Sequence, residues 1–60
     1  MSAVYNPEAD IMAEIERLEL EAKGIRKRIE HASNTEDKRV LNRQLGELEA
    51  QVAHLQKRLP

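Results

Sequence analysis

The fold of this chain is decided by two stretches, residues 11–32 (IMAEIERLELEAKGIRKRIEHA) and residues 41–59 (LNRQLGELEAQVAHLQKRL). In both stretches aliphatic residues recur at alternating steps of four and three. A 3.5-residue period held over this many turns indicates a helix with one apolar stripe, as in a coiled coil. The predicted helix–helix seam consists of Ile11, Ile15, Leu18, Ala22, Ile25 and Ile29 in the first stretch and Leu41, Leu45, Leu48, Val52, Leu55 and Leu59 in the second.

The residues between and before these stretches indicate where the helices begin and end. Asn6-Pro7-Glu8 is a typical helix start, because Asn can cap free amides and Pro suits the first helical position. The run Ser33-Asn34-Thr35-Glu36 favours a turn, and either Ser33 or Thr35 could cap the second helix. We therefore expect a short N-terminal tail at 1–6 and a helical hairpin at 7–60. Its first helix spans about 7–32, its turn 33–36 and its second helix about 36–59.

The seam also predicts how the helices align. In an antiparallel pair, the position numbers of facing residues have a constant sum. A sum of 70 sets an aliphatic residue opposite every seam residue, from Ile29 with Leu41 to Ile11 with Leu59, whereas a sum of 63 sets Ile25 opposite Lys38. The predicted fold is all-α, an antiparallel two-helix hairpin with a coiled-coil seam.

The length and composition suggest that this hairpin needs a partner. The chain has 60 residues, one aromatic residue and no cysteine. Chains this short rarely build a self-sufficient core without a disulfide, a metal or a second chain. We expect it to dimerise into a four-helix bundle, since two-fold symmetry is the commonest arrangement of homo-oligomers. A partner helix from another protein is an equivalent expectation.

Charge is distributed unevenly along the chain. Residues 1–22 carry a net charge of −5 and residues 23–43 a net charge of +4. Folding at Thr35 would gather positive charge at the turn end of the hairpin and negative charge at the open end. Two hairpins packed antiparallel would then place unlike charges side by side.

Three interpretations of this charge pattern compete, and we favour the first. It directs self-assembly, it binds nucleic-acid phosphates, or it is an ordinary solvated surface. The basic residues available for anion or nucleic-acid contact are Lys23, Arg26, Lys27, Arg28, Lys38, Arg39 and Arg43. The overall acidic balance and the lack of an aromatic residue near the turn weigh against nucleic acid. The sequence thus favours a small protein–protein interaction module, acting as adaptor, chaperone or regulator, with an RNA- or DNA-binding regulator as the alternative.

Nothing in the sequence indicates catalysis. His31 and His54 lack a second His or Cys at metal-ligand spacing, and no glycine-rich phosphate loop is present. We expect no catalytic residues, no metal site, no cofactor and no enzymatic activity. No apolar run approaches a membrane span and no leader precedes the helices, so we expect a cytoplasmic protein that does not enter membranes.

Overall fold

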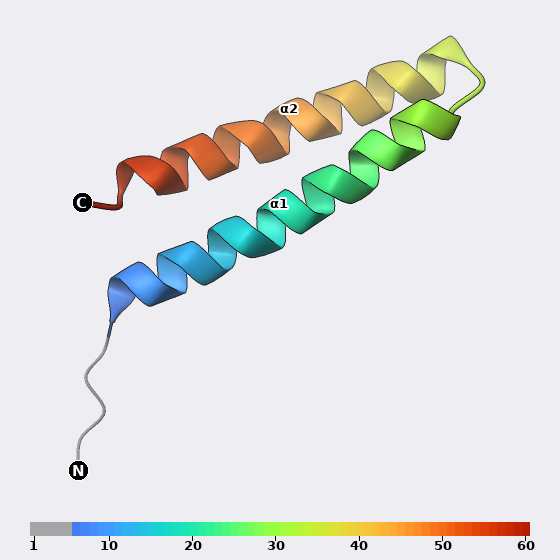
Figure 1. Cartoon of the computed structure of the whole chain (residues 1–60). Coiled ribbons are helices and arrows are strands. Elements are labelled where there is room, and N and C mark those ends of the chain that lie inside the picture. Colours follow the sequence, from blue (N-terminus) through green and yellow to red (C-terminus); the bar gives the residue numbers. More distant parts are fainter. Residues whose placement is uncertain (1–5) are drawn as a thin grey trace.

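Residues 6–60, the part that the structure describes, form an all-helical hairpin in a computed structural model (Figure 1). Helix α1 spans Pro7–His31 and helix α2 spans Thr35–Lys57. The helices run antiparallel, with the turn at one end of the molecule and the start of α1 beside the end of α2 at the other. The predicted N-terminal tail lies outside the described residues, apart from Asn6.

Helix α1 begins at a side-chain cap. The Asn6 backbone is extended, and its Oδ1 accepts hydrogen bonds from the amides of Glu8 and Ala9 at 3.1 and 3.3 Å. Pro7 follows at the first helical position, where its missing amide proton costs nothing. Acidic Glu8 and Asp10 lie in the first turn, where the helix dipole favours negative charge.

Helix α2 is capped by a residue that the sequence analysis did not select. Asn34 is extended, and its Oδ1 accepts a 2.8 Å hydrogen bond from the Asp37 amide. The prediction that Ser33 or Thr35 is the cap is wrong, because Thr35 is already helical and Asn34 bonds the amide three residues on. Helix α2 ends at Lys57, slightly before the expected end near 59. Its last turn is tight, with the amides of Arg58 and Leu59 bonded to the carbonyls of Leu55 and Gln56.

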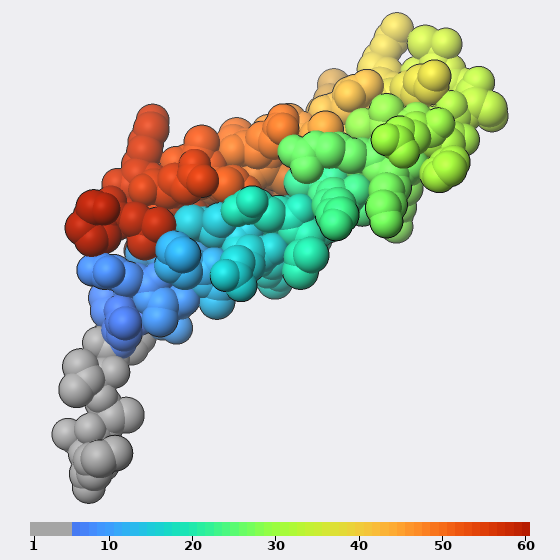
Figure 2. All heavy atoms as spheres, in the orientation of Figure 1, coloured from blue at the N-terminus to red at the C-terminus, as the bar shows by residue number. Residues whose placement is uncertain are grey.

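The two helices are in contact along their length (Figure 2). Residues of both helices line common hollows, for example Arg28 and Leu41 in one and Ala22 and Glu49 in another. Within residues 6–60, no helix is long and apolar enough to cross a membrane.

The seam residues are the least exposed part of the described chain. Ile15, Leu18 and Ala22 are buried, and every other predicted seam residue is half-buried. Among residues 6–60, Glu14 is the one charged side chain that is also half-buried. The described core is therefore a single line of aliphatic side chains, closed only near the middle of α1.

Two leucines on α1 provide a matched test of this packing. Leu18 is 3% exposed and Leu20 is 69% exposed. Leu18→Ala should lower the free energy of unfolding by about 2–5 kcal/mol, because a buried leucine loses its contacts and leaves a cavity. Leu20→Ala should cost clearly less. Urea unfolding followed by circular dichroism, at one protein concentration, measures both; a larger loss at Leu20 would contradict the observed packing.

The cap of α2 gives a second test. Asn34→Ala should lower the free energy of unfolding by about 1 kcal/mol, because the Asp37 amide loses its acceptor. Ser33→Ala is the control and should change stability little. Thermal melts of both variants would detect the difference, and equal effects would argue against Asn34 as the cap.

Candidate functional site

The surface most able to bind a partner is the seam itself, because it is only partly covered. Two cylinders touch along a line and leave that line open on both sides. In α2 no residue is buried; its five predicted seam residues are half-buried, as is Leu59 just after the helix. The hairpin therefore presents two long flanks with apolar floors.

The two flanks are distinguished by their place in the sequence. Successive helix residues are about 100° apart, so the neighbours of a seam residue project to opposite sides. Residues one place before a seam residue lie on what we name the leading flank, for example Glu14 before Ile15. Residues one place after it lie on the trailing flank, for example Glu16. Because the helices are antiparallel, this rule gives the same flank on both helices.

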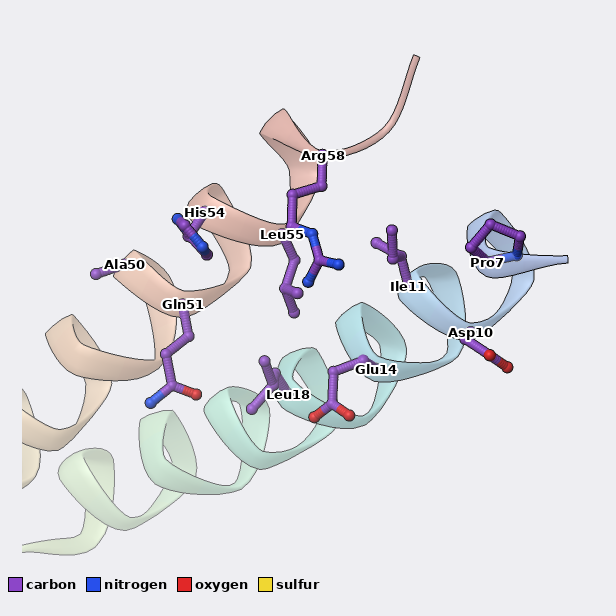
Figure 3. A pocket seen from close by; sticks show the side chains of 10 residues that line it. All are labelled: Pro7, Asp10, Ile11, Glu14, Leu18, Ala50, Gln51, His54, Leu55 and Arg58. Carbon is purple, nitrogen blue, oxygen red and sulfur yellow. The ribbon is translucent and has the colours of Figure 1, made fainter.

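The leading flank is hollowed at both ends of the hairpin. At the open end, the side chains of Ile11, Leu18 and Leu55 project into the space between the helices, while Asp10 points away from it (Figure 3). This open-end hollow is lined by Pro7, Asp10, Ile11, Glu14, Leu18, Ala50, Gln51, His54, Leu55 and Arg58. A second hollow near the turn is lined by Lys27, Arg28, His31, Ala32, Asp37, Val40 and Leu41. Both are apolar at the floor and charged at the rim.

Ion pairs within α1 occupy the rim of the leading flank. Arg17 donates hydrogen bonds to Glu14 and, at 2.8 Å, to Glu21. The bond to Glu14, together with that carboxylate's charge, raises the pKa of Arg17 above its usual value. The charges of these three side chains are therefore already paired within their own helix.

A hollow on the trailing flank lies near the middle of the hairpin. It is lined by Glu16, Glu19, Leu20, Ala22, Lys23, Arg26, Glu49, Val52, Ala53 and Gln56. Arg26 and Glu49 form an ion pair across the seam at 3.3 Å, the one pair that joins α1 to α2 among the described residues. Both side chains are more than half exposed, so the pair contributes at most about 1 kcal/mol.

The seven basic residues considered for nucleic acid are not gathered on one surface. Lys27 and Arg28 line the turn-end hollow of the leading flank, whereas Lys23 and Arg26 line the trailing hollow. The other three, Lys38, Arg39 and Arg43, are exposed on α2 and line none of these hollows. Acidic residues also lie near the turn, including Asp37 on the rim beside Lys27. The hairpin carries its basic residues around the turn half, not as a single strip.

The two histidines lie in separate hollows of the leading flank, His31 near the turn and His54 near the open end. In the described range 6–60, no three His, Cys, Asp or Glu side chains are grouped so that they could hold a metal ion.

The difference between the flanks is the feature that sequence reasoning missed. A charge pairing at a sum of 70 would place Glu49 near Glu19, and both do line the trailing hollow. Glu49 nevertheless pairs with Arg26, whose long side chain reaches the neighbouring turn of α2. A signal was present: Arg26 and Glu49 each directly follow a seam residue, which places them on the same flank.

Comparison with known proteins adds no assignment: no family model, no curated protein and no solved structure matches this chain.

Proposed function

We propose that this chain is a small non-enzymatic protein–protein interaction module that works by covering its open seam with other helices. The observation that carries the proposal is the exposure of the seam. Within residues 6–60, Ile15, Leu18 and Ala22 are the only buried hydrophobic residues, while α2 contributes half-buried leucines along its whole length. Covering apolar surface is the main favourable term in protein association.

The simplest partner is a second copy of the hairpin. Small helical chains need additional burial to offset the loss of chain entropy on folding. Two hairpins packed flank to flank form a four-helix bundle in which the half-buried seam residues become a shared core. Such a homodimer provides helix faces on which an adaptor, chaperone or regulator can act, and a helix of another protein can occupy the same seam.

Sedimentation and thermal melts test this function. The purified chain should sediment as a dimer at tens of micromolar, and its Tm should rise as protein concentration rises, because dilution favours the unfolded monomer. A well-folded monomer of 6.9 kDa whose Tm does not depend on concentration would contradict the proposal.

Nucleic-acid binding through the turn half is the competing hypothesis, and salt separates it from the proposal. Phosphate contacts release counterions, so such binding would weaken steeply with salt. With the basic residues dispersed over both flanks and mixed with acids, we expect no retention on heparin or mixed RNA in low salt. Retention that is lost in Lys27→Gln/Arg28→Gln, but kept in Lys57→Gln/Arg58→Gln at the open end, would favour the nucleic-acid hypothesis instead.

A further inference from the structure

We infer that the trailing flank binds the trailing flank of a second copy of this chain, with the turn end of each copy beside the open end of the other. This inference rests on the proposed function, because it names the surface through which the hairpin associates. It assigns the two flanks different roles: the trailing flank forms the dimer, and the leading flank stays outward.

Charges along the trailing flank of α1 are self-complementary in this orientation. Glu16 and Glu19 lie in the acidic half of α1, and Lys23 and Arg26 follow in the basic half. We place a two-fold axis perpendicular to the helices, close to residue 21 of α1. Residues of the two α1 helices then face each other when their position numbers sum to 42. Glu16 of one copy then faces Arg26 of the second copy, and Glu19 faces Lys23. Symmetry repeats both contacts.

Three of these four residues have unused charge within their own chain, whereas Arg26 already pairs with Glu49. Among the described residues, Glu16, Glu19 and Lys23 form no ion pair. On the leading flank, by contrast, Glu14 and Glu21 both hold Arg17. The same two-fold operation on that flank would place Glu14 opposite Arg28 but Glu21 opposite its own copy. The leading flank of α1 therefore has one attractive pair where the trailing flank has two. Electrostatic complementarity selects partners and register, so it favours the trailing flank.

Helix α2 fits the same axis. The alignment that gives a sum of 42 on α1 gives a sum of about 98 on α2, which brings Gly46 close to Ala53 of the second copy. It also sets Glu49 opposite its own copy, where each Glu49 keeps Arg26 of its own chain as a partner. Both residues directly follow a seam residue and so lie on the trailing flank. A side chain at Gly46 would meet no atom within 4 Å in the hairpin, so packing of α1 on α2 does not require a glycine there. Small residues at this place let the α2 helices of the two copies approach closely.

The area is sufficient for a stable dimer. The 25 residues of α1 extend roughly 37 Å at 1.5 Å per residue, and two helices side by side are roughly 20 Å wide. A flank of this size offers roughly 700 Å², close to the roughly 800 Å² that each partner contributes to a standard interface. Docking also covers Leu20, the most exposed of the large hydrophobic residues that the structure describes, which lines this hollow.

The opposite orientation, with both turn ends together, loses these contacts. It would pack α1 of one copy against α2 of the other with sums near 70. Glu49 would then lie between Glu19 and Lys23, and Glu16 would face Ala53. The charges therefore favour the arrangement in which the turn end of each copy lies beside the open end of the other.

Charge-swapped pairs test the surface and the orientation together. Glu16→Lys/Glu19→Lys makes every α1 contact repulsive in a homodimer, and so does Lys23→Glu/Arg26→Glu. Each variant alone should raise the dimer dissociation constant at least about tenfold, since several attractive pairs become repulsive. An equimolar mixture should restore association to within about threefold of the wild type, because both sets of contacts are again attractive. Sedimentation equilibrium measures association, and circular dichroism follows helix content in parallel.

The matched control uses the same two changes on the other flank. Glu14→Lys/Glu21→Lys should still dimerise with itself, because its trailing flank is unchanged, and in a mixture it should leave Lys23→Glu/Arg26→Glu monomeric, because its lysines lie on the leading flank. A mixture of the trailing-flank variants that stays dissociated, or one rescued equally by the control, overturns the inference. A dimer that resists both trailing-flank variants also overturns it but leaves the proposed function intact. A monomeric wild type removes the proposed function itself.

Discussion

A pair of helices cannot enclose the line along which they touch, and the rest of this structure follows from that constraint. The aliphatic stripes of α1 and α2 pack together with no polar residue in the seam, yet most of their side chains stay half-buried. Only at Ile15, Leu18 and Ala22 does the packing close. The two helices complete the hairpin fold, but they do not bury its apolar residues completely. Most seam residues therefore belong both to the core and to the surface.

Charge has a different role from apolar contact in this molecule. The ion pairs of Arg17 and Arg26 are exposed, and pairs of this kind add little to stability. Charged residues can instead select one alignment over another. Like charges brought together in a wrong alignment cost free energy, whereas unlike pairs in the right alignment are neutral or mildly favourable. In the proposed dimer, the gradient from acidic to basic along α1 would therefore set the orientation, and the leucines and isoleucines would supply the affinity.

Some of this was predictable from the sequence and some was not, for physical reasons. The two-helix hairpin could be predicted because helical periodicity is fixed by backbone geometry. The cap of α2 could not, because Ser33, Asn34 and Thr35 are all good caps and only the local backbone selects Asn34. The difference between the flanks was also missed. Long side chains such as Arg26 and Arg17 can reach several acidic residues, and the alignment of the seam does not predict which of them they pair with.

The brief connection between the helices, Ala32 to Asn34, also bears on the order in which the molecule folds. In the predicted alignment, the pairs nearest the turn join residues close in sequence, such as Ile29 and Leu41, while pairs at the open end, such as Ile11 and Leu59, join residues far apart in sequence. Closing a short loop costs less entropy than closing a long one. The hairpin should therefore zip from the turn towards the termini, with the basic half ordered before the acidic half. The end that forms last is the end where the chain begins and finishes.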